Sequence, residues 1–387
     1  MTMAFIILFA LVFVVLAIDW WPQFYIWQSR IKIGRWTDRN AWREAVATKS
    51  LQWLKKTPTI PLTDNKRLIV IDMLKGNYKR NAIQHWQHAA LLLGLIKQYE
   101  STGDDKIRQK IDGFIDSKIS QSGQWKQTPK EIDGVILAYA FTQATWRNPQ
   151  QMKPAYDAMW QLIQDLTGVD GTVQYRKHMK AYRYVDTIGF ICPFLMNYGM
   201  AFGNANAIDL ACRQIAAYNE HGMYPGKFIP CHTYNVENGM TAGLYGWGRG
   251  LGWYAIGLMD SWTALPESHP QRRMLTESVV KFARAAMDFQ QDYGAWNWLI
   301  TNNNTTPDSS ATATLAWFLA NASAIPTLKP DCDIAVGKAL KHLMSVTKRD
   351  GAIDLAQGDT KGIGMYSHAF GILPFAQGFA LRTAFYP

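Results

Sequence analysis

Cysteine is scarce in this sequence, and its few copies are far apart. The 387 residues hold four cysteines, and none of them belongs to a Cys-x-x-Cys pair. Zinc ribbons and dithiol redox sites need such closely spaced pairs, and the His and Cys residues show no other metal-ligand spacing. We therefore expect no metal, no cofactor and no obligatory disulfide. The four residues are Cys192, Cys212, Cys231 and Cys332.

Dense runs of Lys or Arg are also missing, although the net charge is +10. No recognised nucleic-acid-binding motif accompanies that charge, so we expect no nucleic acid as a partner. The excess of positive charge favours an anionic partner or a membrane surface. An acidic carbohydrate would need only a local positive field. Charge by itself does not choose between these two.

Alternating strand patterns of any length are absent as well. The chain shows helix-length apolar periodicities separated by turns that contain glycine. Its hydrophobic fraction of 48% is enough to bury a sizeable core. The sequence predicts an all-α protein with twelve helices after the N-terminal segment. These helices are expected over 39–56, 81–100, 105–120, 132–146, 150–167, 184–202, 205–219, 247–265, 269–290, 309–322, 332–348 and 365–382.

One short turn, glycine followed two residues later by an aromatic or β-branched residue, recurs six times. Its intervals are about as long as two helices with their connections. Such a period predicts six helical hairpins in a solenoid or a closed ring, and terminal helices as apolar as the middle ones favour closure. We expect an (α/α)6 barrel, with an open superhelix as the alternative. The turns begin at Gly76, Gly123, Gly171, Gly222, Gly294 and Gly351, and the longest interval predicts an insertion between Gly222 and Trp247.

The N-terminus differs from the rest of the chain, because residues 4–18 form an unbroken apolar run. Trp20 and Trp21 follow it, as at a membrane interface, while no basic residue precedes it and no small-x-small cleavage site follows. We expect a short hydrophobic helix that stays as an uncleaved anchor, although the run is short for a spanning helix. The domains are thus predicted as 1–30, the anchor or signal-like segment, and 31–387, the barrel.

The side of the membrane stays open. The basic residues near the run all follow it, and the positive-inside rule would then place the barrel in the cytoplasm. Large domains can also be exported regardless of charge, so a periplasmic or extracytoplasmic barrel is the alternative. The residues concerned are Arg30, Lys32, Arg35 and Arg39.

Two carboxylates occupy the same step of consecutive repeats. Asp186 lies where the helix after the third turn begins, and Asp133 has the same position after the second turn. Each could serve only as a helix N-cap. In a barrel, however, the residues just past each turn meet at one mouth, so the two carboxylates would converge. That is an arrangement expected for acid/base chemistry on sugars.

A glycine-rich stretch, Trp247-Gly248-Arg249-Gly250-Leu251-Gly252-Trp253, opens the helix after the insertion. Three glycines in five residues suggest that something approaches the backbone closely. Arg249 and Trp253 share a helical face and could clasp an anionic sugar, or could simply pack together. His232 is either a site residue or a loop histidine, and His178 is a weaker case. The helix start at 308–313 is explained by an ordinary N-cap. The small residues at the helix start at 364–368 are explained by close packing.

These segments together resemble the unsaturated glucuronyl and unsaturated rhamnogalacturonyl hydrolases of glycoside hydrolase families 88 and 105. The likeness spans roughly residues 40 to 385 and rests on Glu131-Ile132-Asp133-Gly134, Tyr184-Val185-Asp186-Thr187 and the glycine-rich stretch. Ser309-Ser310-Ala311-Thr312-Ala313 also looks like the family's small-residue helix start. The resemblance implies an (α/α)6 barrel without a metal, acting on acidic oligosaccharides that end in an unsaturated uronate.

The resemblance also implies a mechanism, hydration of the C4=C5 enol ether that a polysaccharide lyase leaves behind. Asp186 would protonate C4 and then take a proton from the water that adds at C5, while Asp133 would hold and orient the sugar. The substrate-binding residues would be Tyr175, His232, Trp247, Arg249 and Trp253. This chain departs from the family in two ways. Relatives often have a histidine about eleven residues before the catalytic aspartate, whereas His178 is eight residues before Asp186. The apolar N-terminus is also not part of the family pattern.

Two alternatives stay open. The barrel could carry another carbohydrate reaction, as an ordinary glycosidase, an epimerase or a polysaccharide lyase. It could also be a membrane-anchored glycan-binding protein without activity. The presence of both carboxylates with Arg249 argues against an inactive site.

Overall fold

Six helical hairpins, each an outer helix followed by an inner helix, make up most of the residues that the computed structural model describes, which are 2–61, 64–77 and 84–386. The outer helices are α2 (Arg39–Lys55), α5 (Asp105–Lys118), α7 (Pro149–Asp165), α9 (Ala205–His221), α11 (Arg272–Asp288) and α13 (Lys329–Ser345). The inner helices are α4 (His85–Thr102), α6 (Val135–Thr142), α8 (Val185–Phe202), α10 (Gly248–Ala264), α12 (Ser309–Ala322) and α14 (Pro374–Ala384).

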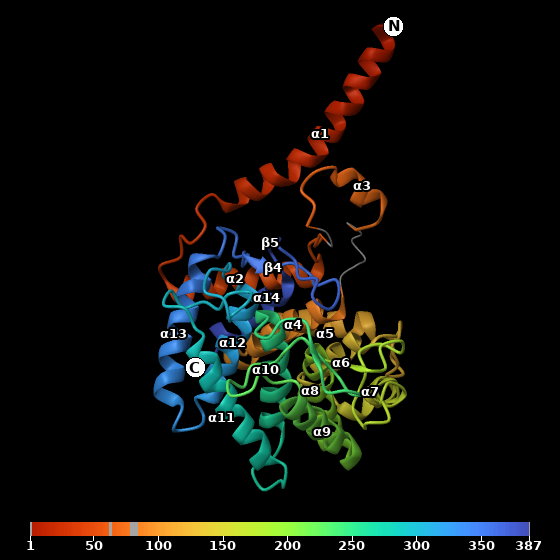
Figure 1. Ribbon diagram of the computed structural model, residues 1–387, viewed down its shortest axis with the longest axis vertical. Coiled ribbons are helices and arrows are strands. Elements are labelled where there is room, and N and C mark those ends of the chain that lie inside the picture. Colours follow the sequence, from red (N-terminus) through yellow and green to blue (C-terminus); the bar gives the residue numbers. More distant parts are fainter. Residues whose placement is uncertain (1, 62–63, 78–83, 387) are drawn as a thin grey trace.

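The inner helices form a closed ring. Each contacts the next along the chain, and α14 contacts α4 to complete the circle. An inner helix therefore has neighbours on every side, which explains why nearly all of α10 and α12 is buried, whereas an outer helix such as α11 buries one face. Because the last inner helix meets the first, the fold is the expected (α/α)6 barrel and not an open superhelix (Figure 1).

Each turn glycine lies within a hairpin, between its outer and its inner helix. Gly351, after α13, has φ +85°, and a Cβ there would lie 2.2 Å from the carbonyl oxygen of Ala45 in α2. Only glycine meets both conditions, so this contact between the last and first outer helices needs that residue. Five of the six turn glycines have positive φ, and Gly222 is the exception with φ −102°. The aromatic residue of the first turn, Tyr78, lies outside the described residues.

The predicted helices agree with the observed ones to within a few residues, apart from the ends of two of them. The helix expected over 81–100 begins at His85 in the structure, and residues 81–83 lie outside the described part. The prediction is wrong over 365–373, because α14 begins only at Pro374. The preceding residues instead include β5 (Phe370–Gly371), which pairs antiparallel with β4 (Ala356–Gln357).

The expected insertion after Gly222 supplies two strands of a small sheet beside the barrel mouth, and the segment before α8 supplies the third. Strands β1 (Tyr182–Tyr184), β2 (Thr233–Asn235) and β3 (Thr241–Ala242) pair antiparallel in that order. With only two or three residues each, they leave no alternating pattern in the sequence that could predict them. Their importance is positional, since β1 runs directly into α8 and β2 follows His232.

The N-terminal helix is longer than the apolar run. Helix α1 spans Thr2–Arg30 and projects away from the barrel (Figure 1). Its first part is almost entirely exposed, and its last turn is tied to the barrel by an ion pair from Arg30 to Asp354 at 2.7 Å. A short helix, α3 (Ile69–Leu74), lies beside it, held by the carboxylate of Asp19.

Candidate active site

A cavity of about 260 Å³ opens at the end of the barrel where the inner helices begin. Of the seven residues predicted for the site, six line it and Asp133 does not. The full lining is Gln84, Trp86, Tyr175, Arg176, Met179, Tyr184, Asp186, Phe190, His232, Trp247, Arg249, Trp253, Asp359, Thr360, Lys361 and Gly362. The barrel therefore brings together residues that are far apart in the chain.

Asp186 lies in the first turn of α8 with its carboxylate in the cavity. It does not act as the N-cap of this helix, because that position belongs to Tyr184. Its Oδ2 is buried without a hydrogen-bond partner among the described residues. Burial raises the pKa of Asp186 to about 7, against the opposing effect of the Arg249 charge. A carboxyl group of this kind can both give and take a proton near neutral pH.

His232 faces that carboxylate. Its Nε2 lies 3.7 Å from Asp186 Oδ2, and its Nδ1 lies 3.1 Å from the hydroxyl of Tyr366. Burial, with the Arg249 charge, lowers the pKa of His232 to about 4, so the ring is neutral at pH 7. The pair therefore consists of a titrating carboxyl group and a neutral imidazole.

The small sheet sets this pairing. Tyr184 in β1 is opposite Thr233 in β2, and the next amide, of Val185, donates to the carbonyl of His232 at 3.0 Å. The antiparallel register thus places His232 beside the first turn of α8. A one-residue slip would turn the side chains to the other face of the sheet, so the register matters for the site.

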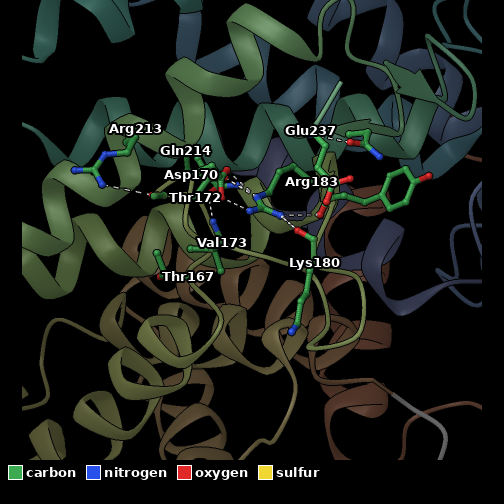
Figure 2. Close-up of polar contacts among 12 residues, drawn as sticks. Thr167, Asp170, Thr172, Val173, Lys180, Arg183, Arg213, Gln214 and Glu237 are labelled. Atoms are coloured by element: carbon green, nitrogen blue, oxygen red, sulfur yellow. Dashed lines mark hydrogen bonds and ion pairs between the residues drawn. The ribbon is translucent and has the colours of Figure 1, made fainter. Parts of the chain in front are cut away.

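Arg183, one residue before the end of β1, fastens the loop that precedes it. Its guanidinium pairs with Asp170 and cannot donate to water instead, because the side chain is only 1% exposed. It also donates to Thr172 at 2.5 Å and to the carbonyl of Lys180 at 2.8 Å, so both ends of the loop converge on it (Figure 2). The loop between carries Tyr175, which lines the cavity.

Arg249 is buried at the cavity wall and supports the loop opposite. It donates to the carbonyl of Gln357 at 2.6 Å, to that of Gly358 at 2.7 Å and to Thr360 Oγ1 at 3.3 Å. These acceptors are neutral, and no carboxylate lies within ion-pair distance of Arg249 in the described part of the chain. The cation therefore leaves a positive field in the cavity.

The aromatic partner of Arg249 is Trp247 and not Trp253. The guanidinium lies 5.3 Å from the Trp247 ring, whose Nε1 donates to Gln357 at 2.9 Å. Trp253 packs instead against Phe190 at 4.5 Å and against the edge of Trp86 at 5.5 Å. Both indoles line the cavity, but they are largely buried, so each exposes only an edge or part of a face to a ligand.

The glycines of this stretch bring two helices together. A Cβ at Gly248 would lie 2.8 Å from the Ala311 side chain, and one at Gly252 would lie 2.5 Å from Thr314 Oγ1. The close approach inferred from the sequence is therefore made by α12, the next inner helix. The cap predicted at its start is confirmed, because Asp308 accepts from the amides of Ser310 and Ala311.

Asp133 lies beside the cavity, in the 3₁₀ turn Ile132–Gly134 that precedes α6. Its Oδ2 is 3.9 Å from Arg176 Nη2, and Arg176 also pairs with Glu131 at 3.1 Å and stacks 3.9 Å from the ring of Tyr175. Burial raises the pKa of Asp133, partly offset by the Arg176 charge. Arg176 thus links Asp133 to the cavity that Asp186 lines.

Several lining residues were not expected from the sequence. Gln84 and Trp86 lie at the start of α4, and Asp359 to Gly362 belong to the loop between α13 and α14. The position of Trp86 at a repeat start could have identified it. His178 is exposed and does not line the cavity. Within the described residues, no group of three or more His, Cys, Asp or Glu side chains could hold a metal.

Sequence comparisons with known proteins find a family and a relative. The sequence model of Glycosyl Hydrolase Family 88 matches residues 63–371. The unsaturated rhamnogalacturonyl hydrolase YesR of Bacillus subtilis is 19% identical over 307 residues, which cover 77% of this chain and 86% of that protein.

Solved structures share the fold. A possible member of family 105 from Salmonella enterica has a TM-score of 0.75 at 18% identity, covering 90% of this chain and 94% of its own. The unsaturated glucuronyl hydrolase of Bacillus sp. GL1 has a TM-score of 0.65 at 17% identity, with 88% and 94% covered. The family match covers most of the chain, and the chain therefore belongs to the glycoside hydrolases of the family 88 and 105 group.

Proposed function

We propose that the protein is a glycoside hydrolase that removes a terminal 4,5-unsaturated uronic acid from oligosaccharides by hydrating the C4=C5 bond. The family supports the reaction class, and its relatives include an unsaturated rhamnogalacturonyl hydrolase and an unsaturated glucuronyl hydrolase. The observation that carries the proposal is Asp186, a buried carboxyl group in the cavity whose Oδ2 accepts no hydrogen bond from the described part of the chain and whose pKa is about 7.

One group that switches from acid to base is sufficient for this reaction. Asp186 gives its proton to C4, and the positive charge that develops at C5 is shared with the ring oxygen. Water then adds at C5 and returns a proton to the carboxylate. The resulting hemiketal opens to a ketone at C5, the anomeric carbon becomes a hemiacetal bearing the aglycone, and that hemiacetal collapses to release the aglycone alcohol.

The surroundings suit an acidic sugar. The buried charge of Arg249, which has only neutral hydrogen-bond acceptors, would attract the carboxylate of the uronate. Arg176, with part of its charge engaged by Glu131, and Lys361 add positive charge to the lining. Neutral His232 would hold the attacking water or a sugar hydroxyl, because its Nε2 faces Asp186. Asp133 would orient the sugar through the Arg176 side of the cavity.

The experiment uses the purified protein with unsaturated glucuronyl and galacturonyl disaccharides, and follows the ultraviolet absorbance of the conjugated enol ether. We expect the absorbance to fall as the double bond is hydrated. New absorbance from an intact acidic polysaccharide would identify a lyase instead. An unchanged signal with all of these substrates, together with measurable binding, would favour the glycan-binding alternative.

We also propose that α1 is retained as a membrane anchor, with residues 31–387 as the catalytic domain. The helix is long and apolar enough to cross a membrane, and it is almost wholly exposed as far as Leu16. Its last turns contact the barrel through Arg30, a contact that a removed leader would not need. Mass spectrometry of the mature protein from isolated membranes tests this: an intact N-terminus supports the anchor, and a start beyond residue 18 refutes it.

A further inference from the structure

Helix α3 exposes an unusual number of apolar side chains for so short an element. Leu68 is 54% exposed, Ile71 43%, Met73 51% and Leu74 84%. Single exposed apolar residues are common on protein surfaces, but three on so short a helix and a fourth at its N-cap, Leu68, mark an interaction surface. No described part of the barrel covers them.

The segment is built to present these residues outward. The carboxylate of Asp72 is buried on the inner side, where it accepts from the amides of Asn65 at 2.9 Å and Asn77 at 3.0 Å. Ile69 is buried on the same side. The polar side of residues 64–77, the α3 segment, therefore faces inward, and its apolar face remains outside.

The α3 segment is fastened to α1 at one level of that helix. Asp19 accepts from the backbone amides of Leu68 at 2.6 Å and Ile69 at 2.7 Å. This acid comes directly after the apolar run of α1, next to Trp20 and Trp21, which are each 70% exposed. If the run lies in a bilayer, these indoles lie at its interface, and α3, which is hydrogen-bonded to the adjacent Asp19 and lies beside α1 (Figure 1), lies at the same depth.

Basic residues flank the apolar face. Lys66, Arg67 and Lys75 are exposed at the two ends of α3, and the described part of the chain shows no ion pair for them. Basic groups around an apolar face are the pattern of segments that rest on anionic lipid headgroups. Binding to a protein partner would not require the apolar face of α3 to lie at the same depth as Trp20 and Trp21, whereas binding to a bilayer does.

We propose that the α3 segment is a second membrane contact, which inserts Leu68, Ile71, Met73 and Leu74 into the interface of an anionic bilayer beside α1. This inference rests on α1 being retained as the anchor. With two contacts instead of one, the barrel is held in a defined orientation and does not swing freely on its helix.

The orientation brings the active-site mouth close to the bilayer. Asp64 of the α3 segment accepts from the Ser367 hydroxyl at 2.5 Å and from the His368 amide at 3.0 Å, and Arg30 of α1 pairs with Asp354. Between residues 354 and 367 lies the loop that supplies Asp359 to Gly362 to the cavity. The enzyme would therefore take acidic oligosaccharides at the membrane surface.

The test is lipid quenching of a fluorophore on the full-length protein in lipid nanodiscs. An environment-sensitive label is attached to Leu74→Cys, and to Ile334→Cys as the matched control, since Ile334 is 61% exposed on α13, away from the mouth. All four native cysteines are buried, so each variant reports one position. Both side chains are exposed, and neither substitution should affect folding.

We expect blue-shifted emission at position 74, with quenching several-fold stronger than at position 334 by headgroup-attached quenchers. Quenching at position 74 should be stronger in discs with about one third phosphatidylglycerol than in neutral discs. The double variant with Lys66→Glu and Lys75→Glu should lose that increase. Equal, water-like emission at both positions in discs that retain the protein would overturn the α3 contact while leaving the anchor intact. Blue-shifted emission without lipid quenching would indicate a protein contact and also overturn it. If none of the variants stayed in the nanodiscs, the proposal that α1 is a membrane anchor would be refuted.

Discussion

His232 Nε2 and Asp186 Oδ2 face each other at 3.7 Å, although the two residues come from different repeats of the barrel. The register of β1 and β2 holds them there, and burial drives their pKa values in opposite directions. The carboxyl group therefore keeps its proton to about pH 7, while the imidazole stays neutral down to about pH 4. This inversion of the usual order is what lets a carboxylic acid donate a proton at neutral pH.

The first prediction concerns the pH profile. Because only protonated Asp186 can donate to C4, kcat/KM should be flat between about pH 4 and pH 7 and then fall roughly tenfold per pH unit. The measurement is the initial rate at low substrate concentration across this range. A profile that rises from pH 6 to pH 9 would mean that an ionised base, not an acid, starts the reaction.

The second prediction concerns Arg249, whose charge lowers the pKa of Asp186. In Arg249→Gln the basic limb of the profile should move to higher pH, and KM for the anionic substrate should rise about tenfold or more. Arg249→Lys keeps the charge and should leave the limb near its original place, although it loses the contacts to the 357–360 loop. If the basic limb of the pH profile had the same position in both variants, the charge of Arg249 would have no effect on the pKa of Asp186.

The third prediction separates positioning from stability at Arg183. Arg183→Lys breaks the fork of contacts to Asp170, Thr172 and Lys180 and should cost about 1–3 kcal/mol of unfolding free energy. It should also lower kcat at least tenfold, because β1 leads into Asp186. The matched control is Arg382→Lys, which breaks the buried pair with Asp260 at the other end of the barrel.

Both variants should lose similar stability, measured by urea unfolding. Only Arg183→Lys should lose kcat, since Arg382 lies far from the cavity lining. Equal losses of kcat in the two variants would mean that Arg183 contributes to stability alone.

The fourth prediction is a stability difference that depends on pH. Burial raises the pKa of Asp186 from 3.8 to about 7, so the folded protein binds this proton more tightly than the unfolded chain. Stability from this group is full below pH 3.8 and is lost as the pH rises through 7. Asp186→Asn should therefore match the natural protein at pH 4 and exceed it by about 1–4 kcal/mol at pH 8. A constant difference across this range would contradict the raised pKa.

Much of the barrel could be predicted from the sequence, because the repeats each leave a local signal. The turn glycine after an outer helix, such as Gly351, can be recognised from the local sequence alone, and so can an apolar inner helix such as α10. Their common period then implies which helix starts meet. Asp186 and Asp133 were found in this way, although the role of each is still a prediction.

Other parts of the site depend on contacts that leave no local pattern. The strands of the small sheet are too short for a period-2 signal, so the approach of His232 to Asp186 could not be derived from spacing. Trp247, and not Trp253, lies beside Arg249 because the carbonyls of Gln357 and Gly358 draw the guanidinium toward their loop. The β4–β5 pairing likewise replaced the first part of the last predicted helix.

The central claim, that Asp186 is the acid of an enol-ether hydration, is tested most directly by one comparison. The rate of absorbance loss from an unsaturated uronyl disaccharide is measured at pH 6 for the natural protein and for Asp186→Asn, with circular dichroism to verify that the variant is folded. An amide cannot donate the proton, so we expect a rate at least a thousandfold lower. A folded Asp186→Asn variant that retains more than about a tenth of the rate would contradict it.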